Sequence, residues 1–241
     1  MTMNMINQEL SKLFEYWKDR SQGAFVQDGL MNVGRWSDED YWDEPLRIAF
    51  VTKEPYYDNQ EDADGEDYRA YNLVEMSEHS RFWKNILTWT YGLYNTNIHG
   101  YPAYDDASEF SSRKIAFENI PFSLVNVKKT CGGSTTNKGI LRNYAQTFVR
   151  ELSKELRTIL CPNIIVCCGT QDVISKIIYK DYNLLQIDNE GWTHYDKEHD
   201  TLFIWTYHPS ARMSDKYIYD SMINSYCCFL NKYPFPIKKS N

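Results

Sequence analysis

Four short, nearly continuous apolar runs limit what this chain can fold into. They lie at about 46–52, 120–127, 163–168 and 202–206. Continuous apolar character of this kind is typical of strands in a parallel sheet that is covered on both faces. Such strands are joined by right-handed crossovers, which are usually helical. The sequence therefore predicts a parallel sheet with helices on either side.

Helical patterns fill the gaps between these runs. A leading helix is expected over 5–20, where one face is apolar, and further helices at roughly 80–91, 139–160, 171–179 and 214–231. We therefore expect an α/β fold, a three-layer α/β/α sandwich with a central, mainly parallel four-stranded sheet. One domain is expected over 1–241, with an N-terminal helical extension at about 1–45. The acidic stretch at 58–67 is interpreted as a solvated loop.

The cysteines indicate a protein of a reducing compartment, and the apolar pattern does not indicate a membrane protein. The apolar runs of this 241-residue chain are too short to cross a bilayer, and its start lacks a signal-peptide pattern. Six cysteines, at positions 131, 161, 167, 168, 227 and 228, form no regular framework, and the two adjacent pairs suggest buried thiols on opposite faces of an element. We expect a soluble cytoplasmic protein with no membrane partner, no cofactor and no iron–sulfur cluster. His194, Asp196 and His199 indicate a polar hairpin rather than a metal site.

Polar segments follow three of the predicted strands. The first run leads into Thr52-Lys53-Glu54-Pro55-Tyr56-Tyr57-Asp58, and the last leads into Tyr207-His208-Pro209-Ser210-Ala211-Arg212-Met213-Ser214. The middle run, Phe122-Ser123-Leu124-Val125-Asn126-Val127, carries an asparagine at its end. Ligands of open α/β sheets bind beyond the carboxyl ends of the strands. We therefore expect Glu54, Asn126 and His208 to meet in one cleft.

These three segments, in this order, resemble the motifs of the uracil-DNA glycosylase superfamily. Its first loop often reads G-Q-D-P-Y-H, its second H-P-S-P-L-S or H-P-S-P-R-N, and its middle strand ends in an asparagine in several branches. The resemblance covers about 46–229 and implies the fold and the chemistry of that superfamily. The chain departs from the first motif at Thr52, Lys53 and Glu54, which stand where the superfamily has Gly, Gln or Glu, and Asp.

The resemblance implies a role for each matched side chain. Glu54 takes the place of the acid that orients the attacking water, and His208 that of the histidine that donates to a uracil oxygen; both would be catalytic. Asn126 would read the edge of the base, while Pro55 and Tyr56 would border it. Four of these residues also have a structural alternative: a turn cap for Glu54, a strand-end hydrogen bond for Asn126, a loop histidine for His208 and core packing for Tyr56.

A second group of residues is assigned to the nucleic-acid backbone. Lys128, Lys129 and Ser134 belong to a loop rich in glycines and hydroxyls before a predicted helix, which indicates a phosphate cradle or a plain capped turn. Arg212 lies where the superfamily carries the wedge that replaces a flipped nucleotide, and Ser210 belongs to the same loop. For Arg212, a solvated surface position is the alternative.

The leading hypothesis is a DNA glycosylase-like hydrolase that binds a flipped pyrimidine, uracil or a modified base, and hydrolyses its N-glycosidic bond without a metal. The expected partner is single- or double-stranded DNA or a ligand that contains a nucleobase. The net charge of −7 opposes binding to DNA. A local basic patch would offset this charge. That patch would consist of Lys53, Lys128, Lys129, Lys138 and Arg212. A non-catalytic nucleobase-binding or nucleic-acid-binding module and a structural interaction protein are the alternatives.

Overall fold

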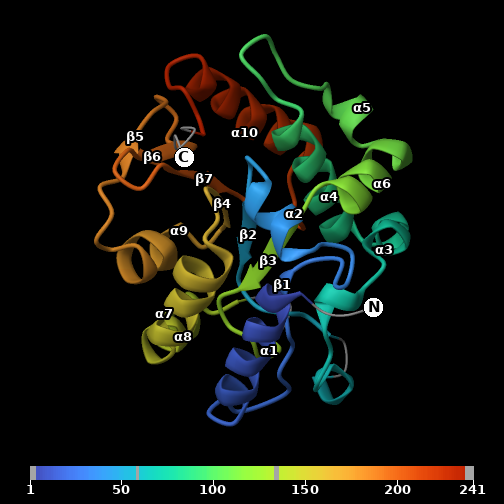
Figure 1. Ribbon diagram of the computed structural model, residues 1–241, viewed down its shortest axis with the longest axis vertical. Coiled ribbons are helices and arrows are strands. Elements are labelled where there is room, and N and C mark those ends of the chain that lie inside the picture. The colour runs from blue at the N-terminus through green and yellow to red at the C-terminus, as the bar shows by residue number, and fades with distance from the viewer. Residues whose placement is uncertain (1–3, 58–59, 133–135, 237–241) are drawn as a thin grey trace.

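The computed structural model describes residues 4–57, 60–132 and 136–236, and a mixed sheet forms its centre (Figure 1). Seven strands of the described residues make this sheet, in the order β1-β3-β2-β4-β7-β6-β5. The four apolar runs supply its middle, where neighbouring strands are parallel. Their bounds are β2 Ile48–Thr52, β3 Phe122–Asn126, β4 Ile164–Cys168 and β7 Thr201–Thr206. The α/β class is confirmed.

The prediction of four strands is wrong in number, because antiparallel strands extend the sheet at both edges. β1 (Gly29–Leu30) pairs with β3, β6 (Thr193–Asp196) pairs with β7, and β5 (Leu185–Gln186) pairs with β6. β1 and β5 have two residues each, too few for a periodic pattern. β6 has the sequence Thr-His-Tyr-Asp and is buried although it is polar in composition. A strand of this composition is not recognised from apolar runs in the sequence.

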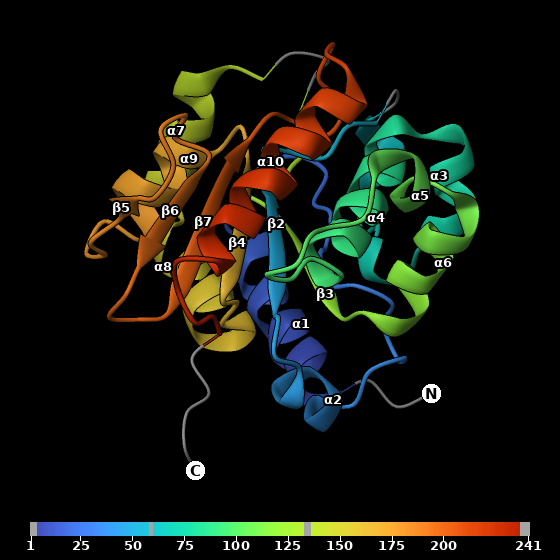
Figure 2. The ribbon, with the colours of Figure 1, turned by 90° about the horizontal axis from the view of Figure 1, so that it is seen from above.

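Helices cover both faces of the sheet, as the alternation of side chains along its strands requires. Along β2, Ile48 and Phe50 belong to one apolar cluster, whereas Ala49 and Val51 belong to the other. The first cluster is closed by α3 Leu73–His79, α4 Arg81–Tyr94, α5 Tyr104–Ala107, α6 Phe110–Asn119 and α10 Asp215–Leu230. The second is closed by α1 Met5–Lys18, α2 Asp38–Asp43, α7 Lys138–Thr147, α8 Val149–Lys154, η3 Glu155–Leu160, α9 Gln171–Val173 and η4 Ile174–Ile178. Figure 2 shows α10 crossing the strands on the face opposite α1.

The helical predictions hold in outline and differ in detail. The pattern predicted at 139–160 is divided into α7, α8 and the π-helical η3, and the one predicted at 171–179 into α9 and the π-helical η4. Two short 3₁₀ turns, η1 Gln60–Ala63 and η2 Tyr68–Ala70, follow the first motif loop. None of the described helices combines the length and the apolar character that a membrane crossing needs.

The N-terminal segment is part of the folded core. Asn4 caps α1 by accepting from the backbone N–H of Asn7, and the apolar face of α1 packs on the sheet. The chain then returns as β1, which adds to the edge of the sheet at β3. The expectation of a helical extension at 1–45 therefore has to be corrected, because this segment also supplies a strand and a buried acid, Asp28.

The cysteines follow the expectation at one adjacent pair and depart from it at the other. Cys167 and Cys168 are both buried and lie in opposite apolar clusters, because neighbouring residues of β4 face opposite sides of the sheet. Burial raises the pKa of both thiols. Cys228, by contrast, is exposed on α10.

Candidate functional site

A cleft of about 1220 Å³ lies at the carboxyl ends of the parallel strands. Glu54, Asn126 and His208 all line it, as their positions at the ends of β2, β3 and β7 predict. Segments distant in sequence close it, including the start of α4 and residues 190–192. The aromatic residues of the lining are Tyr56, Tyr68, Phe82, Trp83, Trp192, Trp205, Tyr207 and Tyr217.

Glu54 is held in the cleft by Lys128. The Lys128 ammonium lies 2.8 Å from Glu54 Oε2 and also donates to the carbonyl oxygens of Thr130 and Cys131, each at 2.9 Å. These contacts occupy all three N–H groups of the ammonium. The prediction that Lys128 binds a phosphate is therefore wrong, because its donors are committed inside the protein.

Gly132 makes room for the carboxylate of Glu54. A Cβ atom at this position would lie 1.9 Å from Glu54 Cδ, well inside van der Waals contact. The backbone cannot easily yield, since the N–H of Gly132 donates to the carbonyl of Pro55 at 3.0 Å. In the sequence, the glycines of this loop indicate a phosphate cradle or a plain capped turn, not a space for a carboxylate.

We expect Gly132→Ala to lower the free energy of unfolding by about 1–3 kcal/mol, because the new methyl group displaces the carboxylate of Glu54 from Lys128. Urea unfolding measures the change. In a Glu54→Ala background the same substitution should cost much less, because the clashing group is absent. Equal costs in both backgrounds would contradict the role given to Gly132.

Asn126 is 2 % exposed, and both ends of its side-chain amide are hydrogen-bonded. The Thr52 hydroxyl donates to Asn126 Oδ1 at 2.7 Å, and Asn126 Nδ2 donates to Asp28 Oδ2 at 3.0 Å. The same Asp28 oxygen accepts the backbone N–H of Asn126 at 2.7 Å. Among the residues that the structure describes, one N–H and one lone pair of the amide remain without a partner. Asp28 has no apparent functional signal in the sequence, and Thr52 was noticed only as a departure from the motif.

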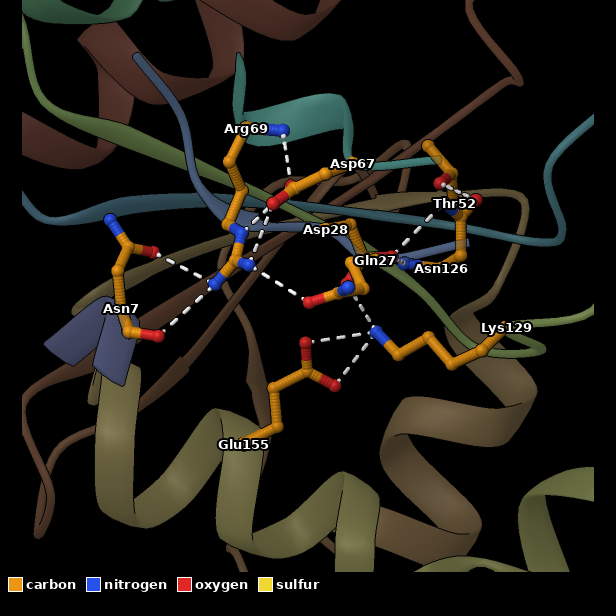
Figure 3. Close-up of polar contacts among 9 residues, drawn as sticks. All are labelled: Asn7, Gln27, Asp28, Thr52, Asp67, Arg69, Asn126, Lys129 and Glu155. Atoms are coloured by element: carbon orange, nitrogen blue, oxygen red, sulfur yellow. Dashed lines mark hydrogen bonds and ion pairs between the residues drawn. The ribbon is translucent and has the colours of Figure 1, made fainter. Parts of the chain in front are cut away.

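Lys129 is fully buried in a cluster with Asp28 and Glu155, all three of which are 0 % exposed (Figure 3). Its ammonium contacts Asp28 Oδ1 and lies 2.8 Å from Glu155. Burial raises the pKa of the Glu155 carboxyl well above its usual value, against the pull of Lys129. The prediction that Lys129 binds a phosphate is wrong, because the two acids hold it in the interior.

His208 presents one ring N–H that forms no hydrogen bond with any of the described residues. Its Nδ1 accepts the backbone N–H of Ser210 at 3.2 Å, so the proton of the neutral ring is on Nε2. Burial, reinforced by the charge of Lys53, lowers the pKa of His208 to about 4. The ring is therefore neutral at pH 7 and can donate from Nε2.

This lowered pKa predicts a pH-dependent contribution to stability. The unfolded chain takes up a proton at His208 as the pH falls through 6.5, whereas the folded chain does so only near 4. His208 therefore stabilises the fold above pH 6.5, and its contribution is lost as the pH falls toward 4. Between these values, His208→Gln should lose less stability on acidification than the wild type does, as denaturant unfolding at several pH values measures. His99→Gln, at an exposed site, is the control; parallel curves for wild type and His208→Gln would contradict the assignment.

The remaining predicted residues lie in different surroundings. Pro55 is buried and Tyr56 is 56 % exposed, and both line the cleft. Ser210 is exposed and also lines the cleft. Arg212 is exposed and lies one residue beyond Ala211, which does line it. Ser134 lies outside the described residues.

Three further polar groups, which no motif in the sequence marks, line the cleft. Gln171 Oε1, Trp205 Nε1 and Thr206 Oγ1 are buried and have no hydrogen-bond partner among the described residues. A buried polar atom without a partner is costly, and at a cleft wall a ligand can satisfy it. Their signal in the sequence is limited to their place shortly after β4, at the start of α9, and at the end of β7.

The predicted hairpin is present, since β6 and β7 are adjacent antiparallel strands. The ring of His194 stacks on Trp205 at 3.5 Å between centroids, and His199 Nδ1 lies 2.9 Å from Asp196 Oδ1. In the described ranges, no group of three or more His, Cys, Asp or Glu side chains could hold a metal ion.

Comparison with known proteins finds no family model that matches the chain and no match among curated proteins.

Proposed function

We propose that the cleft binds a pyrimidine base, uracil or a modified relative, on a nucleic-acid strand and that the protein hydrolyses its N-glycosidic bond. The observation that supports this most is the meeting of Glu54, Asn126 and His208 in one cleft from three separate strand ends. The resemblance of these segments to the uracil-DNA glycosylase superfamily supplies the reaction. In this proposal the fold is of that superfamily's type, with added edge strands.

Asn126 and His208 would hold the base by its polar groups. The free N–H and lone pair of the Asn126 amide match an adjacent carbonyl oxygen and N–H on a pyrimidine ring. The neutral His208 ring would donate from Nε2 to a second ring oxygen. That hydrogen bond strengthens as the departing base gains negative charge, so it favours the transition state over the bound substrate.

Glu54 would act on the sugar side of the bond. In the hydrolysis the C1′–N bond breaks with its electron pair going to the base, a water oxygen bonds to C1′, and the proton that this water loses ends on the departing base. An ionised carboxylate stabilises the positive charge that develops on the sugar and orients the water. Glu54 Oε2 is paired with Lys128, so the water would be oriented by Oε1.

That ion pair also favours the second candidate, a non-catalytic nucleobase-binding or nucleic-acid-binding module. An acid whose charge is neutralised by a lysine at 2.8 Å stabilises a nearby cation less than a free carboxylate does. The chemistry would then be lost, while Asn126 and His208 would still hold the base.

The phosphate backbone of a bound nucleic-acid strand would contact few cationic side chains. Lys128 and Lys129 are turned inward, which leaves Lys53 and Lys138 in the lining of the cleft and Arg212 near its edge. Arg212 would act as the wedge and Ser210 would contact the backbone. We therefore expect weak non-specific binding and a preference for unpaired bases, whose extraction costs less.

Incubation with a panel of labelled oligonucleotides tests the proposal. Each oligonucleotide carries one uracil or one modified pyrimidine and is used both as a single strand and in a duplex. Alkaline cleavage then reveals abasic sites. We expect cleavage at uracil or one of its relatives, faster in the single strand. Binding without cleavage would favour the module, and the absence of both would refute the proposal.

A further inference from the structure

The cleft is larger than one base requires. Its volume of about 1220 Å³ exceeds the roughly 300–1,000 Å³ of typical sites for drug-sized ligands, and a pyrimidine base is smaller than such ligands. The ring of His208 lies against Phe82 of α4, at 5.5 Å between centroids. The ring of Tyr207 lies instead against Trp192, at 5.9 Å. Two consecutive residues after β7 therefore face different walls of one cleft, the start of α4 and the loop before β6.

Trp192 is held in place by three hydrogen bonds. Its carbonyl accepts the N–H of Trp205 at 2.7 Å, its own N–H donates to Asp188 Oδ1 at 3.0 Å, and its indole N–H donates to Glu190 at 3.1 Å. Trp192 is 8 % exposed, whereas Tyr207, whose ring meets it edge-on at 66°, is 44 % exposed. The ring of Tyr207 is therefore supported from behind by a buried side chain and remains accessible from the cleft that it lines.

We propose that Tyr207 is a stacking site for the base next to the flipped one, so that the cleft binds successive nucleotides of a single strand. The inference rests on the proposed function, because the adjoining residue, His208, would hold the flipped base. An aromatic ring stacks on the π-face of any base, so this contact is tolerant of sequence. Lys53 and Lys138, in the same lining, supply cations for the phosphates of the strand. A duplex keeps the neighbouring base paired and stacked, so the site favours an unpaired strand.

A thermodynamic cycle that changes both the protein and the strand measures this contact. The reference single strand carries 2′-fluoro-2′-deoxyuridine at the target site, because fluorine opposes positive charge on the sugar and so protects the bond. In two further strands a tetrahydrofuran spacer, which has no base, replaces the nucleotide on the 5′ or on the 3′ side of the target. Tyr207→Ala should weaken binding of the reference strand by about tenfold. It should have little effect on one of the two spacer strands, because that strand has no base to stack.

Two control variants make the cycle specific. Tyr207→Phe keeps the ring and should bind every strand as the wild type does. Tyr16→Ala removes a tyrosine that is 58 % exposed on α1, outside the cleft, and should leave all affinities unchanged. A displacement of His208 by Tyr207→Ala would weaken the reference and spacer strands by the same factor, so the cycle distinguishes it from a loss of stacking.

A fourth strand, with the spacer at the target site itself, separates two kinds of failure. The wild type should bind it more weakly than the reference strand, because the base between Asn126 and His208 is missing. If Tyr207→Ala binds the reference strand as tightly as the wild type, or loses the same factor on every strand, the stacking site is refuted while this preference still supports the proposed function. Equal wild-type affinity for the reference and fourth strands would refute the proposed base site, even where the cycle shows stacking on Tyr207. No binding of the reference strand would overturn both.

Discussion

Lys129→Met should lower the free energy of unfolding by about 3–5 kcal/mol, the usual result of removing one partner from a buried ion pair. The ammonium of Lys129 contacts Asp28 and Glu155, and none of the three side chains is exposed. Methionine is of similar length and leaves the buried Asp28 carboxylate without a cation, beside the Glu155 carboxyl. Denaturant unfolding at neutral pH measures the difference.

Two other variants make this prediction specific. Lys138→Met changes an exposed lysine at the start of α7 and should alter stability by no more than about 0.5 kcal/mol. Glu155→Gln should cost far less than Lys129→Met, because burial raises the pKa of Glu155 and favours its protonated form in the fold. The contribution of Glu155 to the free energy of unfolding is full below its unfolded pKa of 4.5 and declines as the pH rises. The stability of Glu155→Gln should therefore increase relative to that of the wild type as the pH rises. A loss below about 1 kcal/mol in Lys129→Met would contradict the account of the cluster.

Glu54→Gln and His208→Ala should each slow excision by on the order of a hundredfold or more while affinity for the substrate strand stays within a fewfold. The reason is that both interactions strengthen as the bond breaks, Glu54 with the charge on the sugar and His208 with the charge on the base. Single-turnover excision and binding, measured on the same uracil oligonucleotide, separate the chemical step from product release.

Glu190→Gln is the matched control for this pair. Glu190 also lines the cleft, but its carboxylate accepts from the indole N–H of Trp192 at 3.1 Å. It lies outside the three segments that carry Glu54, Asn126 and His208. Excision should remain near the wild-type rate. Wild-type rates in Glu54→Gln would remove Glu54 from the chemistry, and another acid or the substrate itself would then have to orient the water.

The strands and the cleft could be predicted from the sequence because both depend on local pattern and on a general rule. An apolar run such as Ile48–Thr52 indicates a buried strand without reference to any other segment. Parallel strands bring their carboxyl ends to one edge of the sheet. Glu54, Asn126 and His208 follow from these two facts. The short edge strands β1 and β5 carry too few residues to form a pattern.

The roles of the lysines could not be predicted because their partners are distant in sequence. Lys128 pairs with Glu54 across 74 positions and Lys129 with Asp28 across 101. A lysine in a loop rich in glycines and hydroxyls has the same local sequence whether it faces a phosphate or a buried acid. The same applies to Asn126, whose partners Thr52 and Asp28 come from other segments.

The most direct test of the central claim is an NMR titration of the ¹⁵N-labelled protein with a single strand that carries 2′-fluoro-2′-deoxyuridine. The account predicts that the side-chain amide of Asn126 and the ring nitrogens of His208 shift together, in proportion to the bound fraction. Binding that shifts neither group, or no binding of this strand at all, would contradict the claim that the cleft holds a pyrimidine base between Asn126 and His208.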